Sequence, residues 1–121
     1  MLIDLIILFS WNTTILNTFQ ERLTKTKIDG KLILMIKNYE EWIKQADYDL
    51  ETADCMFKSG RFIYTIFMCH LAIEKALKGI YTKKLAELPP KNHSLIFFVE
   101  KLQLEMPEEL YDFTYTLNRV S

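Results

Sequence analysis

A chain of 121 residues, half of them hydrophobic and 26% charged, can build one hydrophobic core and is too short for two ordinary domains. The formal net charge of −1 excludes a general attraction to nucleic acid or anionic membranes, so such binding would need a local basic patch. Three glycines and three prolines leave few residues for tight turns, which favours long helices.

Residues 1–37 differ in pattern from the rest of the chain. Apolar positions from Ile15 to Leu23 fit a weak helix, Asp29-Gly30 marks a turn, and the run KLILMI fits either a strand or a buried helix. We therefore treat residues 1–37 as an N-terminal extension whose structure the pattern does not define, and residues 38–121 as one helical domain.

The first firm helix is expected to begin at Asn38. Asparagine is a good N-cap, and Glu41 three residues later completes a capping box. Apolar residues then recur at helical spacing from Trp42 to Phe57. Ser59-Gly60 supplies the stop, because glycine adopts the left-handed conformation without a Cβ clash, so the helix should end near Lys58.

A second helix is predicted from Phe62 to Ala86. Its apolar positions cover a wide arc, which predicts a central and largely buried helix. Gly79 lies inside this helix, where it would permit close approach of a neighbour. Leu88-Pro89-Pro90 must break the helix, since proline lacks the amide proton and restricts the residue before it.

Two shorter helices should complete the domain. Asn92 is expected to cap the third helix, with an apolar face formed by Leu95, Phe98, Val99 and Leu102. Pro107 suits the first turn of the fourth helix, with Leu110, Phe113 and Leu117 facing inward. Because short connections join antiparallel neighbours, the prediction is an all-α, up-and-down antiparallel four-helix bundle.

A row of polar side chains crosses the apolar second helix. Steps of four residues place His70, Glu74 and Lys78 on one narrow stripe. Such a row fits a polar seam between helices or subunits, a binding or catalytic site, or a solvated face. Four-helix bundles hold di-metal centres with Glu-x-x-His motifs, and this chain contains none, so we expect no metal ion.

The cysteines and the first residues bear on compartment and chemistry. Cys55 and Cys69 form no Cys-x-x-Cys pair, so neither a zinc site nor a disulfide framework is expected, and no cofactor is expected. Cys69 adjoins His70, but helix neighbours point apart, which indicates a buried, unreactive thiol. The cysteine pattern favours a reducing, cytoplasmic compartment. The opening MLIDLIILF is too short to span a bilayer, carries Asp4, and lacks a basic start and a cleavage site, so we expect no targeting segment.

A lysine-rich stretch runs from Lys75 to Lys91, and Glu87 is the only acidic residue within it. It is either a solvated face or a local patch for a polyanion. His93, in the sequence PPKNHSL, is placed in the first turn of the third helix. It fits a capping or interhelix residue, or a ligand contact near Lys91.

The sequence WIKQADYDLETADCMFKSGRFIYTIFMCHLAIEKALKGIY, followed by LPPKNHSL, resembles the HEPN family of small helical-bundle proteins. The resemblance covers residues 38–121. It rests on Ala-x-x-Asp-Leu-x-x-Ala in the first helix, Cys-His-x-Ala-x-Glu-Lys-Ala-Leu-Lys in the second, and Pro-Pro-x-x-His-Ser-Leu.

This resemblance implies a homodimer with a cleft between protomers, and a partner nucleotidyltransferase in a toxin–antitoxin-like pair. Many family members are metal-independent RNases that carry an arginine, four to six residues and a histidine. Arg61 lies too far before His70 for this signature, and no arginine lies at the matching distance before His93. The family commonly continues beyond the fourth helix, whereas this chain stops soon after Arg119, so we expect a truncated bundle.

Three functions stay open. The first is a catalytically incomplete module that binds nucleotide, RNA or a nucleotidyltransferase through a cleft formed by His70, Glu74, Lys78, Lys91 and His93. The second is an active metal-independent RNase, in which His70 or His93 is the acid–base group and Lys78 or Arg119 stabilises phosphate. The third is a purely structural, dimeric interaction bundle.

Overall fold

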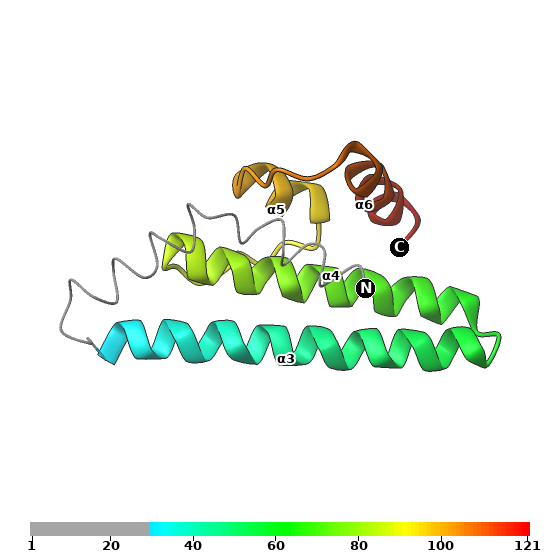
Figure 1. The fold of residues 1–121 in the computed structure, drawn as a ribbon, viewed down its shortest axis with the longest axis horizontal. Coiled ribbons are helices and arrows are strands. Elements are labelled where there is room, and N and C mark those ends of the chain that lie inside the picture. The colour runs from blue at the N-terminus through cyan, green and yellow to red at the C-terminus, as the bar shows by residue number, and fades with distance from the viewer. Residues whose placement is uncertain (1–29) are drawn as a thin grey trace.

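The computed structural model of the chain describes residues 30–121. This part contains four helices and no strand: α3 (Gly30–Lys58), α4 (Phe62–Leu85), α5 (Leu95–Lys101) and α6 (Glu108–Val120) (Figure 1). The all-α prediction is confirmed. The weak helix expected between Ile15 and Leu23 lies outside the described residues.

Helices α3 and α4 form a long antiparallel hairpin (Figure 1). Gly60 turns the chain between them with a φ of 72°, the left-handed conformation that the sequence predicts for the helix stop. Gly79 permits the close approach of the two helices, because a Cβ at this position would lie 3.1 Å from Cβ of Trp42. An alanine there would require its neighbours on α3 to move by a few tenths of an ångström.

Helix α3 begins eight residues earlier than predicted. It starts at Gly30 rather than at Asn38, so KLILMI forms its first turns and Asn38 lies within the helix. Leucine, isoleucine, methionine and lysine all propagate a helix without a break, and this outweighs the capping preference of a single asparagine. The proposed boundary between residues 37 and 38 therefore falls inside a continuous helix.

Helix α4 is buried along its second half only. The prediction of a largely buried helix holds from Ala72 to Thr82 and is wrong for the first turns, where Ile63 is 82% exposed. The difference has a simple cause. Helices α5 and α6 are short, and the apolar core lies where they pack on the second half of α4, around Ile73, Leu77 and Phe98.

Helix α5 begins later than predicted, with Ser94 rather than Asn92 as its N-cap. The Ser94 hydroxyl oxygen accepts a hydrogen bond from the Phe97 amide at 3.2 Å. Asn92 instead accepts from the Ser94 amide through its Oδ1 at 2.9 Å, which shapes the turn before the helix. His93 consequently precedes the helix. The predicted apolar face is confirmed, since Leu95, Phe98, Val99 and Leu102 are all buried.

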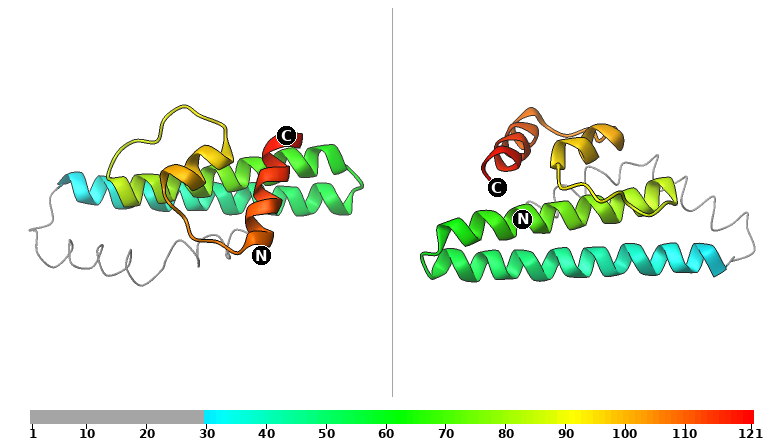
Figure 2. Two further views of the ribbon diagram at one scale, coloured as in Figure 1. Left: turned by 90° about the horizontal axis from the view of Figure 1, so that it is seen from above. Right: turned by 180° about the vertical axis from the view of Figure 1, so that it is seen from behind.

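Helix α6 follows Pro107 and crosses the hairpin on the same side as α5 (Figure 2). Leu110 and Leu117 face the core as predicted, whereas Phe113 is 45% exposed and that part of the prediction is wrong. The inward position is taken by Thr114, which is fully buried and donates its hydroxyl to the Leu110 carbonyl at 2.8 Å. The Asn118 Oδ1 accepts from the Leu95 amide at 2.7 Å and so ties α6 to α5.

Within residues 30–121, no helix combines the length and apolarity that crossing a membrane requires.

Candidate functional site

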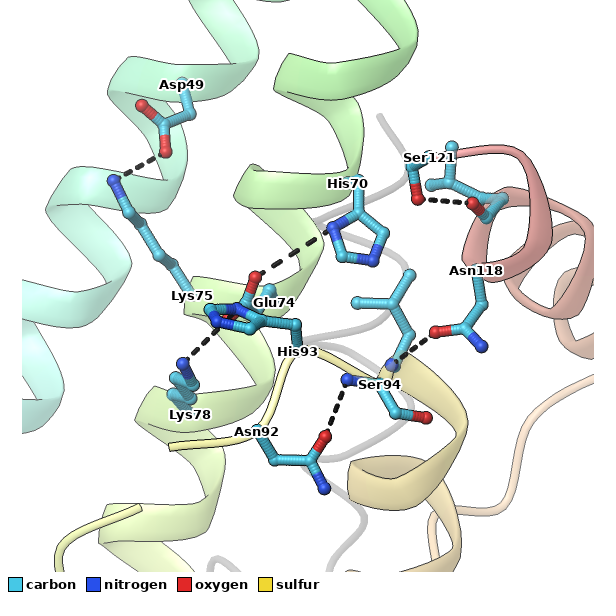
Figure 3. A network of polar contacts seen from close by, with 12 residues as sticks. Asp49, His70, Glu74, Lys75, Lys78, Asn92, His93, Ser94, Asn118 and Ser121 are labelled. Atoms are coloured by element: carbon cyan, nitrogen blue, oxygen red, sulfur yellow. Dashed lines mark hydrogen bonds and ion pairs between the residues drawn. The ribbon is translucent and has the colours of Figure 1, made fainter. Parts of the chain in front are cut away.

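Three of the polar residues singled out in the sequence meet at one buried carboxylate. The Glu74 side chain is 4% exposed, and its Oε1 accepts from Nζ of Lys78 at 2.7 Å and from Nδ1 of His93 at 2.8 Å (Figure 3). Nδ1 of His70 lies 3.9 Å from Oε2, which is longer than a hydrogen bond. We call these four residues the Glu74 cluster.

The local structure explains how the cluster assembles. Residues 70, 74 and 78 share one face of α4, as the four-residue spacing predicts. The segment after α4 is broken by Pro89 and Pro90, and the Asn92 amide donates to the Pro90 carbonyl at 2.8 Å. This turn returns the chain along α4 and places His93 over Glu74 (Figure 3).

The charge state of Glu74 is fixed by its partners. Burial alone would raise its pKa, but the hydrogen bonds from Lys78 and His93 outweigh burial and hold the pKa below its ordinary value. Glu74 is therefore a carboxylate at neutral pH. Because a carboxylate only accepts hydrogen bonds, Nδ1 of His93 carries the proton, and the second ring nitrogen, Nε2, is left for other partners.

His93 and His70 have opposite environments. The His93 side chain is 82% exposed, so its Nε2 is accessible to solvent, whereas the His70 side chain is 12% exposed. Burial lowers the pKa of His70, despite the nearby Glu74 charge that acts in the other direction. His70 is consequently neutral at pH 7, and Oε2 of Glu74 lies buried without a hydrogen-bond partner.

Most of the lysine-rich stretch is engaged inside the domain. Lys75 pairs with the buried Asp49 at 2.7 Å, Lys78 pairs with Glu74, and Nζ of Lys83 lies 4.3 Å from the Tyr39 ring centroid. Lys84 donates to the Leu102 carbonyl. Lys75, Lys83 and Lys84 therefore join α4 to α3 or to the end of α5, and Lys78 pairs within α4, so all four are engaged inside the domain. Lys91 differs, because it is exposed and lies in the same segment as His93.

Arg119, the remaining candidate site residue, lies outside the Glu74 cluster. Its guanidinium carbon is 6.0 Å from the Tyr115 ring centroid on the exposed side of α6, and no contact joins it to the Glu74 cluster among the described residues. Cys69 is half-buried, and burial raises the pKa of its thiol, which keeps it protonated at neutral pH.

Sequence reasoning noted Asp49 only as part of the Ala-x-x-Asp-Leu-x-x-Ala motif and assigned it no role. Its carboxylate is buried and pairs with Lys75, and so joins α3 to α4. A signal was present, because Asp49 lies three residues after Ala46 and four before Ala53, and both alanines are buried. Spacing of three and four places all of them on one helix face. The aspartate in Ala-x-x-Asp-Leu-x-x-Ala therefore belongs to the helix interface.

No group of three or more histidine, cysteine, aspartate or glutamate side chains that could hold a metal ion occurs in the described part of the chain.

The structure is a helical hairpin covered on one side by two short helices, and its buried carboxylate holds an exposed histidine. These features define the protein as a small all-α domain with a polar centre. Residues 39–120 match the HEPN domain, and the chain belongs to this family. The functions of HEPN domains are generally related to nucleotides or RNA. Comparison with curated proteins and with solved structures gave no match.

Proposed function

We propose that this chain is a catalytically incomplete HEPN module that binds the phosphate of a nucleotide or of RNA beside His93. One observation carries the proposal: the buried carboxylate of Glu74 holds Nδ1 of an exposed histidine at 2.8 Å. The ring is thereby fixed in orientation, and its Nε2 is presented to solvent. Exposed histidines are ordinarily free to rotate, so this arrangement favours a role in binding.

The chemistry around His93 suits a phosphate. When His93 is protonated, Nε2 donates a hydrogen bond, and a charge-assisted bond to a phosphate oxygen is about twice as strong as a neutral one. Lys91 is exposed two residues away and adds a second positive charge. The other lysines of this stretch are engaged within the domain: Lys75, Lys78, Lys83 and Lys84. Lys91 and His93 therefore form the local basic patch that a chain of net charge −1 requires for binding a polyanion.

The catalytic part of the site is incomplete in this proposal. The sequence lacks the arginine-to-histidine signature, and Arg119 lies on Tyr115. Lys78 is within 2.7 Å of Glu74, which offsets the charge it would otherwise offer a transition state. His70 is buried and neutral. Binding is therefore better supported than cleavage.

Calorimetric titration with AMP, ATP and a short single-stranded RNA tests the proposal. We expect His93→Ala to weaken binding by about tenfold, equivalent to the ~1.4 kcal/mol expected of a charge-assisted hydrogen bond. Lys91→Ala should weaken binding by a smaller factor. The matched control is Lys101→Ala, an exposed lysine on α5, which should leave the affinity unchanged. If none of the probes binds, or if His93→Ala binds as the wild type does, the proposal is wrong.

A second candidate, a metal-independent RNase, is favoured by the Glu74–His93 pair itself. A carboxylate that orients a histidine is a common support for a general acid or base. RNA cleavage in the presence of EDTA, abolished by His93→Ala, would establish it. The pairing with a nucleotidyltransferase remains a prediction from the resemblance, and co-purification with the product of a neighbouring gene is its test.

A further inference from the structure

Helix α6 restrains the segment that carries His93. The Leu95 amide, two residues after His93, donates to Oδ1 of Asn118 at 2.7 Å (Figure 3). Asn118 lies in the last turn of α6, 23 residues further along the chain than Leu95. This hydrogen bond is separate from the Glu74 cluster, so the segment is attached to the rest of the domain at a second point.

The hydrogen bonds around the start of α5 differ in where their acceptors come from. The first amides of a helix have no partner within the helix and need acceptors from elsewhere. The Ser94 amide uses the Asn92 side chain and the Phe97 amide uses the Ser94 side chain, so both acceptors belong to the same short segment. The Leu95 amide instead uses a side chain of another helix. It therefore links the position of the segment to the position of α6.

His93 lies between these two attachments. Its Nδ1 donates to Oε1 of Glu74 at 2.8 Å, and the backbone two residues later is held by Asn118. The His93 side chain is 82% exposed, so packing contributes little to the orientation of its ring. The Leu95 side chain, by contrast, is fully buried in the core. A fixed backbone at Leu95 therefore determines where the His93 ring can reach.

We propose that Asn118 is a positioning residue for His93, an inference that rests on the proposed function of His93 in binding phosphate. Asn118 acts through the Leu95 amide. Its bond holds the backbone at the height along α4 where Nδ1 of His93 meets the Glu74 carboxylate. Hydrogen bonds weaken steeply with distance and angle, so a displacement of about 1 Å would release Nδ1 from Glu74. A residue of α6 thereby sets the orientation of a ring in the segment before α5.

The chemistry of Asn118 allows this role to be separated from packing. Its Oδ1 accepts the hydrogen bond, and aspartate would present an equivalent oxygen at nearly the same volume. Leucine has a similar shape and accepts no hydrogen bond, and the serine side chain is too short to reach the Leu95 amide. Asn118→Leu and Asn118→Ser should therefore lose the positioning bond, and Asn118→Asp should keep it.

The tautomer of His93 reports the orientation of its ring without any ligand. A hydrogen bond at one ring nitrogen sets which nitrogen carries the proton, and Glu74 selects Nδ1–H in the wild type. Side-chain ¹⁵N NMR of the full chain with labelled histidine distinguishes the two neutral tautomers. We expect the preference for Nδ1–H to be lost in Asn118→Leu and Asn118→Ser and kept in Asn118→Asp. The matched control is Thr116→Leu at an exposed position on α6, which should leave the tautomer unchanged.

Calorimetric titration with AMP and a short single-stranded RNA connects the tautomer to binding. Asn118→Leu should weaken binding about fivefold, less than His93→Ala does, because the histidine is present but poorly oriented. The double variant His93→Ala/Asn118→Leu should bind as His93→Ala does. A residue that acts through the His93 ring has no effect once the ring is removed, so the two effects are not additive.

Several results would overturn the proposal. The first is a wild-type tautomer and affinity in Asn118→Leu and Asn118→Ser, and another is loss of the Nδ1–H tautomer in Asn118→Asp. A further loss of affinity in the double variant would show instead that Asn118 contacts the ligand itself. If circular dichroism shows that Asn118→Leu and Asn118→Ser are both unfolded, Asn118 supports the whole domain and the positioning role is rejected. If neither probe binds but the tautomer changes as expected, the phosphate-binding function is wrong and the positioning of His93 by Asn118 stands.

Discussion

Glu74 and His93 are 19 residues apart in sequence and are joined by a hydrogen bond of 2.8 Å between Oε1 and Nδ1. This bond attaches the segment before α5 to the middle of α4. Because the Glu74 side chain is 4% exposed and also pairs with Lys78, its carboxylate has both a structural role and an orienting role. Replacing Glu74 should therefore change both the free energy of unfolding and its dependence on pH.

Glu74→Gln should destabilise the fold by about 3 kcal/mol, because it removes one partner of a buried ion pair and leaves Lys78 without its counter-charge. Urea denaturation followed by circular dichroism measures this loss. The matched control is Glu100→Gln on α5, which is exposed and should change the free energy of unfolding by less than about 0.5 kcal/mol.

The same variant has a predicted pH dependence. The pKa of Glu74 is held below 4.5 in the folded state, so its contribution is fully present above pH 4.5 and is lost as pH falls through the lower, folded pKa. The difference in unfolding free energy between wild type and Glu74→Gln should therefore shrink below pH 4.5. A constant difference down to pH 3 would contradict the assigned charge of Glu74.

Periodicity predicted the buried faces of α5 and of the second half of α4 because a helix repeats regularly, and Leu77 and Phe98 are buried as expected. It also placed His70, Glu74 and Lys78 on one face. The contact from His93 could not be predicted, since it depends on the turn made after Pro90. Helix starts were the weakest part of the prediction, because capping residues compete with propagation through good helix formers such as those of KLILMI.

His70 makes stability depend on pH in a different window. Burial lowers its folded pKa below 6.5, so between pH 6.5 and that lower pKa the unfolded chain binds a proton that the folded chain does not. Stability should therefore fall as pH decreases below 6.5. Urea denaturation of His70→Asn should show a flatter dependence from pH 7 to 5.5. An unchanged slope in this variant would rule out His70 as the cause.

Ser94→Ala should destabilise the protein by about 1 kcal/mol, since the Ser94 hydroxyl caps α5 by accepting from the Phe97 amide. Thermal unfolding of the variant measures this cost. Ser59→Ala is the matched control, because the Ser59 hydroxyl donates to the Cys55 carbonyl at an exposed helix end. We expect its effect to be at most half as large, and equal effects would argue against capping by Ser94.

Lys83 should titrate well below an ordinary lysine. Burial lowers its pKa from 10.5 to about 8, and its ammonium lies 4.3 Å from the Tyr39 ring centroid.

Reductive methylation with ¹³C-formaldehyde followed by NMR titration reports each lysine separately. One dimethyl-lysine resonance should titrate near pH 8 and should be absent in Lys83→Arg. If every resonance titrates above pH 10, the half-buried environment of Lys83 does not exist in solution.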